Sequence, residues 1–403
     1  MALLTFDTQH KPRQAYTSMA IVLVLLLIFP FFAAQFGNSW VRIIDIALLY
    51  IMLALGLNIV VGFAGLLDLG YIAFFAVGAY LVGLFSSPQF AALLESVIYY
   101  SPAIGEALVA FFGPEIQRNG IHLSLWAIVP LAALSAALCG ALLGAPTLKL
   151  RGDYLAIVTL GFGEIIRIFM NNLNDPINFT NGPQGINMID PIRIFGVSLA
   201  GEADSKGILH IGSYAMPSVN AYYFLFLALV IASIFITGRL QHSRLGRAWV
   251  AIREDEIAAK AMGINTRNVK LLAFAMGASF GGVAGAMFGA FQGFVSPESF
   301  SLTESIAVLA MVVLGGIGHI PGVVLGGVLL AALPEVLRHV VAPVQQALFG
   351  KVIIEAEVLR QLLYGLALVL IMLVRPAGLW PSPNKEERPN AALVRDDEEA
   401  STT

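Results

Sequence analysis

Long apolar segments recur along almost the whole chain, and they constrain the fold more than any other feature of the sequence. A helix needs about 20 predominantly apolar residues to cross the hydrocarbon core of a bilayer. Segments of this kind recur here, several of them short or broken by glycine. The predicted spans lie near 17–36, 43–62, 71–86, 122–145, 154–170, 220–238, 270–294, 304–320, 322–341 and 361–374. The sequence therefore predicts an all-α, polytopic transmembrane helix bundle with about ten spans.

The composition places the chain in the same class. Of its 403 residues, 58% are hydrophobic and only 12% are charged, whereas a soluble domain carries about a quarter charged residues. The apolar run 19–34 follows a basic N-terminus, as in a secretory signal peptide. Because the same hydropathy continues through the chain, this run is predicted to be an uncleaved first span. Cys139 is the only cysteine, which excludes an intrachain disulfide.

Loop charges predict the orientation of the chain, because basic residues concentrate in cytoplasmic loops. Between the sixth and seventh spans lie Arg239, Arg244, Arg247, Arg253, Lys260, Arg267 and Lys270. Lys149, Arg151 and Arg375 predict two further cytoplasmic segments, whereas 87–121 and 171–219 carry few basic residues and are expected outside. Ten spans with both termini in the cytoplasm satisfy all these assignments.

Three regions follow from this pattern. Residues 1–15 are predicted to form a cytoplasmic N-terminal segment, 16–380 the transmembrane domain, and 381–403 a polar cytoplasmic tail that is too poor in apolar residues to fold. The exterior segment 171–219 is long enough to be either functional or an idle linker. Within it, 180–186 combines turn formers with an exposed amide and hydroxyl, which predicts a position at the outer mouth of a pathway. The residues in question are Thr180, Asn181, Gly182 and Gly185.

One polar segment, 246–265, stands between two predicted spans and carries both charge signs. It is predicted to be helical around 250–262 and to end at Gly263. A short charged helix of this kind suits docking to a soluble partner. Trp249 is expected either to anchor that interface or to lie against lipid headgroups. The predicted coupling residues are Gly246, Arg247, Trp249, Arg253, Glu254, Asp255, Glu256, Ala258, Ala259 and Gly263.

Ionisable residues inside spans are costly and are functional hypotheses by default. Glu164 and Arg167 lie three residues apart on one predicted helix face, so they are expected to pair, either structurally or beside a polar pathway. Asp68 lies in a glycine-bounded break between spans and is expected to cap a turn. Glu304 and Glu335 lie near span ends and are expected to extend to the membrane interface.

Glycine recurs every fourth residue in two places, which forms a smooth helix face that another backbone can approach closely. The glycines predicted to pack helices are Gly277, Gly281, Gly285, Gly289, Gly293, Gly318, Gly322 and Gly326. The sequence has no phosphate-binding G-x-x-x-x-G-K-[ST] motif, no dinucleotide-binding glycine motif after a strand, and no histidine or cysteine cluster with metal-ligand spacing. We therefore expect no catalysis and no bound cofactor.

The polar segment is similar to the coupling loop of ABC importer permeases, whose broad pattern is Glu-Ala-Ala, three residues, then Gly. Ala258, Ala259 and Gly263 keep that spacing, although Ile257 stands at the Glu position and Glu256 precedes it. The string GRAWVAIREDEIAAKAMGIN resembles the LivM type of branched-chain amino acid permeases. Further resemblance lies at 56–80, 142–168, 180–186, 293–300, 313–318 and 375–379.

The resemblance covers nearly all of 40–380 and implies a complex at the bacterial inner membrane. A second permease of the LivH type would complete the pore, two ATP-binding subunits would use ATP, and a periplasmic binding protein would deliver leucine, isoleucine or valine. This chain would itself bind no cofactor and no nucleic acid. Besides these protein partners, it would contact membrane lipid. Within the spans, Asn58 and Thr159 are further candidates for the translocation path.

Three alternatives remain open on the sequence. A related importer would carry urea, short amides or other amino acids. A self-sufficient secondary transporter would need a partnerless intramembrane carboxylate and would leave the docking segment without a purpose. A non-transporting scaffold would leave the glycine-broken spans unexplained. Co-purification with ATP-binding subunits separates the importer from the last two.

Overall fold

The computed structural model describes residues 12–35, 37–147, 150, 152–194, 197–200, 208–211, 214–349, 356–375 and 377–380. Most of the predicted N-terminal segment, the predicted tail 381–403, and the basic residues Lys149 and Arg151 lie outside these ranges. Within them the chain is mostly helical, and a helix occurs at each predicted span. These helices are α1 (Pro12–Gln35), α2 (Asn38–Leu57) continued by the π-helix η1 (Asn58–Phe63), α3 (Ile72–Phe85), α7 (Leu125–Thr147), α8 (Asp153–Asn172), α9 (Ser218–Gln241), α12 (Thr266–Gln292), α13 (Leu302–Gly315), α14 (Ile320–Phe349) and α15 (Ala356–Val374).

Smaller elements join these helices. The helical ones are α4 (Gln89–Tyr100), α5 (Pro102–Phe112), α6 (Ile116–Asn119), α10 (Arg244–Glu254), α11 (Glu256–Ala261) and the 3-10 turns η2 (Gly182–Gln184) and η3 (Pro297–Phe300). The strands form three antiparallel pairs: β1 (Ile186–Asn187) with β6 (Phe294–Val295), β2 (Arg193–Ile194) with β3 (Val197–Ser198), and β4 (Ile208–Ile211) with β5 (Tyr214–Pro217). Helices α4 and α5 occupy a segment that was expected to be an exterior loop.

Four of the described helices are long and apolar enough to cross a membrane: Asn38–Phe63, Trp126–Thr147, Ser218–Gln241 and Thr266–Gln292. Helices α3 and α4 meet at 80° and would together count as a fifth span. Several other apolar helices have only 10–17 residues. The chain is thus a helical membrane protein, and the count of about ten spans stays a prediction.

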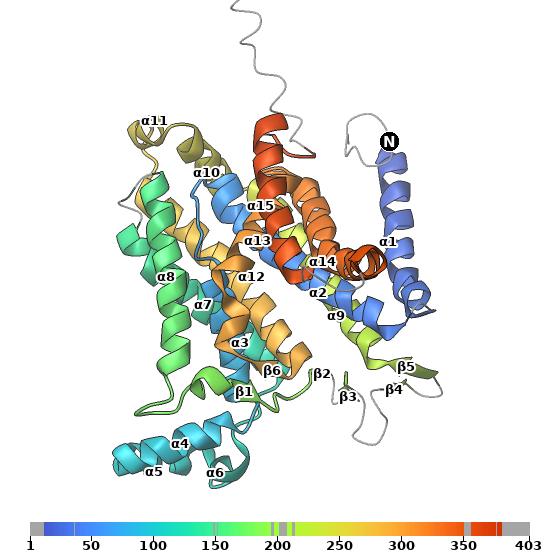
Figure 1. Cartoon of the computed structure of the whole chain (residues 1–403). Helices are drawn as coiled ribbons and strands as arrows, with labels where there is room; N and C mark the ends of the chain where they lie inside the picture. The colour runs from blue at the N-terminus through green and yellow to red at the C-terminus, as the bar shows by residue number, and fades with distance from the viewer. Residues whose placement is uncertain are drawn as a thin grey trace, which may run out of the picture.

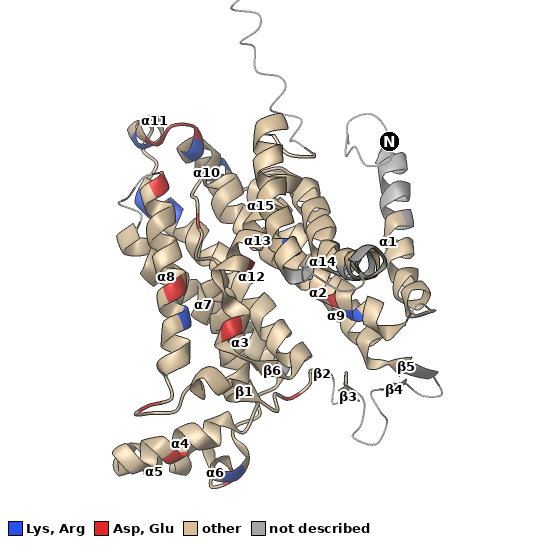
Figure 2. Ribbon diagram, viewed as in Figure 1, with Lys and Arg blue, Asp and Glu red and all other residues tan. Residues whose placement is uncertain are grey.

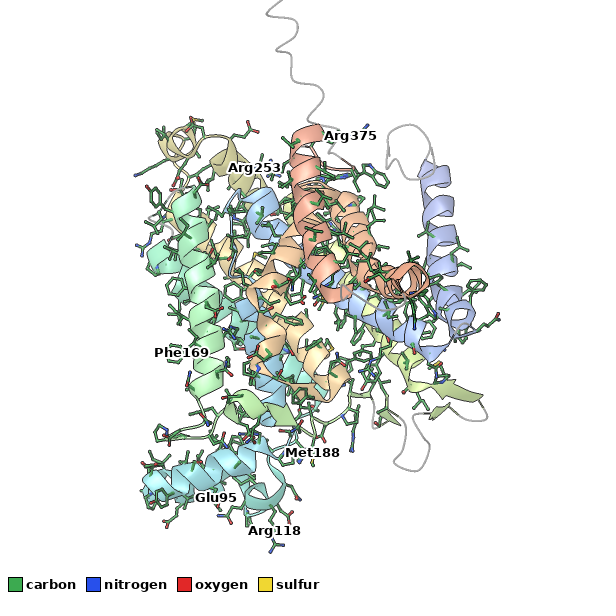
Figure 3. The ribbon with its side chains drawn as sticks, in the orientation of Figure 1. Glu95, Arg118, Phe169, Met188, Arg253 and Arg375 are labelled. Atoms are coloured by element: carbon green, nitrogen blue, oxygen red, sulfur yellow. The ribbon has the colours of Figure 1, made fainter. Side chains whose placement is uncertain are left out.

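The two ends of the bundle carry different elements (Figure 1). Helices α10 and α11, the start of α1 and the end of α15 lie at one end, and α4, α5, α6 and the strands lie at the other. Figure 3 shows Arg253 and Arg375 at the first end, and Glu95, Arg118 and Met188 at the second. Figure 2 shows charged residues at both ends and also between them, for example on α8. The loop charges predicted this grouping of segments; which end faces the cytoplasm stays a prediction.

Helix α12 lies at the centre of the bundle and packs along α7, α3 and α2. Its glycines bring backbones into contact: a Cβ on Gly285 would lie 1.9 Å from the Phe75 carbonyl oxygen, and one on Gly78 would lie 1.9 Å from that of Gly282. Gly277, Gly281 and Gly289 also face α2 or α3. Gly293 differs, because it ends α12 with φ +69° and has no atom within 4 Å of a Cβ.

The second glycine series is not one helix face. Gly318 precedes α14 and has φ +83°, so the expectation that it packs a helix is wrong. Gly322 and Gly326 do lie in α14, where a Cβ would be 2.4 Å from the Gly315 carbonyl oxygen and 2.1 Å from that of Met311. Helices α13 and α14 therefore touch along their backbones.

Helices α3 and α13 each have 14 residues. At about 1.5 Å per residue each is about 21 Å long, which is less than the hydrocarbon core of about 30 Å. Each is joined to the long helix before it by a segment without α-helix, and we call these segments, 64–71 and 293–301, the helix breaks; the second contains η3. The Ser305 hydroxyl, in the first turn of α13, donates a hydrogen bond to the Leu69 carbonyl in the first break. The bundle thus contains two broken helices joined inside the molecule.

Candidate functional site

The polar segment forms two helices, so the expectation of one helix around 250–262 is wrong. Asp255 has an extended backbone (φ −153°, ψ 112°) and separates α10 from α11. Its carboxylate accepts hydrogen bonds from the backbone N–H groups of Ile257 (2.7 Å) and Ala258 (3.0 Å), which caps α11. Gly263 follows α11 with φ +85°, a conformation that glycine adopts without strain.

Trp249 is fully buried, so neither expected position, at a partner interface or against headgroups, is correct. Its indole N–H donates to the Val269 carbonyl at 2.7 Å, and it shares an apolar cluster with Ile59, Val60 and Phe274. Trp249 therefore fixes α10 to η1 and α12. Gly246 is buried as well, because a Cβ there would lie 2.3 Å from the Gln241 carbonyl oxygen.

Arg253 connects α10 to η1, to the break at 64–71 and to the turn before α14. Its Nη1 donates to the Gly62 carbonyl of η1. Its Cγ lies 2.7 Å from where a Cβ would stand on Gly65, and Nη1 lies 3.2 Å from that position on Gly318. Gly318 is also tied to η1, since its N–H donates to Asn58 Oδ1 at 2.9 Å. A movement of α10 is thus transmitted by direct contact to the end of η1 and to the turn before α14.

The turn before α14 is also held by the segment after α15. The Trp380 carbonyl accepts a hydrogen bond from His319 Nδ1 at 2.9 Å, and the Trp380 N–H donates to the Gly315 carbonyl at 3.1 Å. These two bonds tie the turn before α14 to the segment after α15.

The outer side of α10 and α11 combines exposed apolar and charged residues. Ile257 is 71% exposed and Met262 84% exposed. We call the following group the docking surface: Val250, Glu254, Asp255, Ile257, Ala258, Lys260 and Met262, all exposed. Arg247 is exposed too and donates to the His242 carbonyl at 2.9 Å. Glu256 forms an ion pair with the buried Lys270 at 2.7 Å, and Ala259 is buried, so these two residues attach α11 to the bundle.

Glu164 and Arg167 pair on α8, with Arg167 Nε donating to Glu164 Oε1 at 3.0 Å. Arg167 Nη1 also lies 3.7 Å from Glu298 Oε1 of η3. Glu164 lies about 16 Å from the start of α8 at 1.5 Å per residue, which is near the middle of the helix. The three side chains are 40%, 25% and 75% exposed, in the order Glu164, Arg167, Glu298. Open charges at this depth are costly against lipid tails, so this face favours protein or water as its neighbour.

Asn58 and Thr159 are buried at the helix breaks. Thr159 Oγ1 accepts from the Leu69 N–H at 3.0 Å, beside Asp68. The expected turn cap is confirmed, because Asp68 Oδ1 accepts from the Gly70 N–H at 2.9 Å. Both candidate path residues thus support the breaks inside the subunit.

The loop 180–186 is held at the far end of α8. The expected exposed hydroxyl is wrong, because Thr180 is buried and its Oγ1 donates to the Met170 carbonyl at 2.7 Å. Asn181 Nδ2 donates to the Gly185 carbonyl at 2.8 Å. Gly182 and Gly185 have φ of +57° and +70°, and a Cβ on Gly185 would lie 2.4 Å from the Val295 carbonyl oxygen. These glycines therefore let the loop turn tightly against β6.

A polar cavity of about 380 Å³ between α2, α13, α14 and α15 was not expected from the sequence. Glu304 lines it and accepts a hydrogen bond from Tyr50 Oη at 2.6 Å, with Arg360 Nη2 at 3.4 Å. The expectation that Glu304 extends to the membrane interface is therefore wrong, and the side chain of Glu335 lies outside the described residues. Asp45 was also missed, although it lies in the predicted span 43–62: it is fully buried and does not line this cavity, and its carboxylate oxygens have no hydrogen-bond partner in the described part of the chain.

Across the described residues, no three His, Cys, Asp or Glu side chains are placed to hold a metal ion. The docking surface is joined to the inside of the bundle, because Arg253 and Trp249 of α10 contact η1, α12 and the turn before α14.

Residues 39–372 match the family described as branched-chain amino acid transport system / permease component. The chain is 40% identical to the high-affinity branched-chain amino acid transport system permease protein LivM of Escherichia coli, over 90% of this chain and 74% of that protein. The probable LivM of Methanocaldococcus jannaschii is 27% identical over 83% of this chain and 90% of its own length.

The permease protein LivH of Escherichia coli is 33% identical over 40% of this chain and 46% of that protein. No solved structure matches the chain. The family match covers most of the sequence, including the docking surface and both helix breaks. The chain belongs to the family of permease components of branched-chain amino acid transport systems.

Proposed function

We propose that this chain is one permease subunit of an ATP-binding-cassette importer that moves branched-chain amino acids across the bacterial inner membrane. Family membership supports this function and substrate class. The chain is not proposed to be an enzyme: ATP-binding partner subunits hydrolyse ATP, and this subunit contributes the pathway.

The contact of Arg253 with the break at 64–71 and with the turn before α14 is the observation that carries the mechanism. We place two ATP-binding subunits at the importer's cytoplasmic side, with one of them on the docking surface of this chain. Their closure on ATP moves α10, and Arg253 and Trp249 pass that movement to η1 and to the turn before α14. The movement also reaches the start of α13, because the Ser305 hydroxyl in its first turn is hydrogen-bonded to the Leu69 carbonyl in the break before α3.

The charged face of α8 supports a second permease subunit as the neighbour. Glu164, Arg167 and Glu298 together carry one positive and two negative charges. In the proposed complex they line the boundary with a subunit of the LivH type, where water or polar groups replace lipid. The loop 180–186, at the end of α8, then lies at the outer mouth, on the side where a periplasmic binding protein delivers the substrate.

The orientation follows from the basic residues around α10 and α11. This end is proposed to be cytoplasmic, together with both termini, and the chain to cross the membrane about ten times. The short helices α3 and α13 count as spans in this topology, because each is extended by a non-helical break.

Transport by the reconstituted complex tests the proposal. The two permeases, the ATP-binding subunits and the binding protein are placed in vesicles, and uptake of radiolabelled leucine, urea and glutamine is compared with and without ATP. We expect ATP-dependent leucine uptake that a protonophore does not abolish. ATP-dependent uptake of urea alone would favour the related importer class, and uptake that needs a proton gradient but no ATP would favour a secondary transporter.

A further inference from the structure

A cavity of about 450 Å³ lies at the end of the molecule opposite the docking surface. Helices α3, α7 and α12 and the segments 121–124 and 190–193 enclose it. Figure 3 shows Met188, which closely precedes one of these segments, at this end. Sites for small molecules are usually clefts of about 300–1,000 Å³, so the cavity has room for a small solute.

The inner wall of the cavity is apolar. Val82 of α3, Ile128 of α7, and Ala286 and Ala290 of α12 line it, and all four are buried. The two alanines leave room where larger side chains would fill the space between α12 and α7. This wall suits a branched aliphatic group, which gains free energy by leaving water.

The rim of the cavity carries charges of both signs. Asp190 is paired with His122, and both side chains are more than one-third exposed. Arg193 also lines the cavity and is exposed, and it has no ion-pair or hydrogen-bond partner for its side chain among the described residues. A carboxylate and an unpaired guanidinium three residues apart can engage an ammonium and a carboxylate of one ligand.

Backbone hydrogen bonds hold the rim in place. The Asp190 N–H donates to the Ser86 carbonyl at 2.7 Å, and the Leu123 N–H donates to the Phe85 carbonyl at 2.9 Å. His122 has φ +49°, a conformation that costs free energy in a non-glycine residue and that often occurs at functional sites. The rim is thus built by segments anchored to the end of α3.

The polar cavity between α2 and α15 is the competing position for a ligand. Its carboxylate, Glu304, is already bonded to Tyr50 and Arg360. A ligand there would have to break bonds at both charged groups, and the cost would offset the free energy of its own contacts. In the exterior cavity Asp190 is paired with His122, but Arg193 has no side-chain partner among the described residues and can bind a carboxylate without breaking a bond. The exterior cavity is therefore the better candidate.

We propose that the exterior cavity binds a zwitterionic α-amino acid with an apolar side chain before it enters the pathway. Arg193 binds the carboxylate, Asp190 binds the ammonium group, and the wall formed by α3, α7 and α12 receives the side chain. The inference rests on the proposed function and adds to it a receiving site within the permease itself.

Binding to the purified complex, without the binding protein and without nucleotide, tests this site. Equilibrium dialysis measures the Kd for radiolabelled leucine and, by competition, for leucinamide, which lacks the carboxylate, and 4-methylpentanoate, which lacks the ammonium group. We expect Arg193→Gln to weaken leucine binding about tenfold, the effect of one charged hydrogen bond, and to leave leucinamide nearly unchanged. Asp190→Asn should weaken leucine similarly and leave 4-methylpentanoate nearly unchanged.

Arg118→Gln is the matched control, because Arg118 is exposed at the same end of the molecule and does not line the cavity. It should bind leucine as the wild type does. Equal weakening of leucine and leucinamide by Arg193→Gln would show a merely structural effect and overturn the site. The analogues are also measured on the wild-type complex. If leucinamide binds there as tightly as leucine does, the proposed site is overturned. A complex that imports leucine but binds none saturably would overturn the site alone, whereas a complex that imports no branched-chain amino acid would overturn the proposed function too.

Discussion

Arg253 lies where three segments of the chain meet: the end of α10, the end of η1 and the turn before α14. Its aliphatic part covers Gly65, and its guanidinium lies beside Gly62 and Gly318. Larger side chains at Gly65 and Gly318 would displace it, whereas one at Gly62 would meet Asn58 instead. The residue therefore acts by position, as a strut that joins the docking surface to η1, to the break at 64–71 and to the turn before α14.

Replacing Arg253 by alanine should uncouple ATP hydrolysis from transport. The charged hydrogen bond to the Gly62 carbonyl and the contact over Gly65 are both lost, so α10 can move without moving η1. We expect leucine transported per ATP hydrolysed to fall about tenfold, while ATP-binding subunits still co-purify. Arg253→Lys should recover part of the ratio, because lysine keeps the charge and the aliphatic stem but not the planar donor group.

Arg267→Ala serves as the control for this measurement, because Arg267 is an exposed arginine in the first turn of α12. It should keep the wild-type ratio. An unchanged ratio in Arg253→Ala, with normal assembly, would contradict the role of Arg253 as a strut.

At the scale of elements, the crossing of α12 with α3 depends on backbone contact. Gly78 and Gly285 leave no room for a methyl group, since the nearest carbonyl oxygens lie at 1.9 Å. Gly161 of α8 has no atom within 4 Å of its Cβ position. Glycine is thus required at positions 78 and 285, whereas alanine can replace it at position 161.

Gly285→Ala should destabilise the subunit, because overpacking costs about 1–3 kcal/mol. Gly161→Ala should be neutral or stabilising by up to about 1 kcal/mol, since alanine favours a helix over glycine. Thermal unfolding of the purified subunit in detergent provides the comparison. Equal melting temperatures for the two variants would count against close packing of α12 on α3.

The helices themselves were largely predictable, and their breaks were less so. Apolar runs located each of the larger helices because burial in a membrane requires them. The sequence did not predict the break at Asp255. An aspartate that caps a helix differs from one within a helix in its local backbone geometry, which the sequence pattern does not show. The positions of Trp249 and Glu304 were also missed, because their partners lie elsewhere in the sequence. Trp249 is bonded to Val269, and Glu304 is bonded to Tyr50 and Arg360. Periodicity within one segment carries no information about such contacts.

At the scale of the whole molecule, the segments that connect the long helices group at two opposite ends of the bundle. The predicted grouping of loops agrees with the structure, because loop charge depends on which side a segment occupies and not on how helices pack. The cavities were not predictable, as each is lined by residues from several helices. Sidedness itself is open to a direct test with two methionines, Met262 and Met188, which are exposed at opposite ends.

Each methionine is replaced by cysteine in a Cys139→Ser background, which removes the single native thiol. In intact cells, a membrane-impermeant maleimide should label Met188→Cys and leave Met262→Cys unlabelled until the membrane is opened. The expected pattern follows from placing α10 and α11 in the cytoplasm. The reverse pattern would invert the proposed topology.

The central claim is that ATP-binding subunits dock on α10 and α11 and drive the helix breaks through them. The most direct measurement is the amount of ATP-binding subunit that co-purifies with the double variant Ile257→Glu, Met262→Glu, compared with Met188→Glu at the opposite end. Charges introduced into the centre of an interface would be buried without partners, at a cost of several kcal/mol. We predict that the double variant loses the ATP-binding subunits while Met188→Glu keeps them. Full recovery of these subunits with the double variant, correctly inserted in the membrane, would contradict the account.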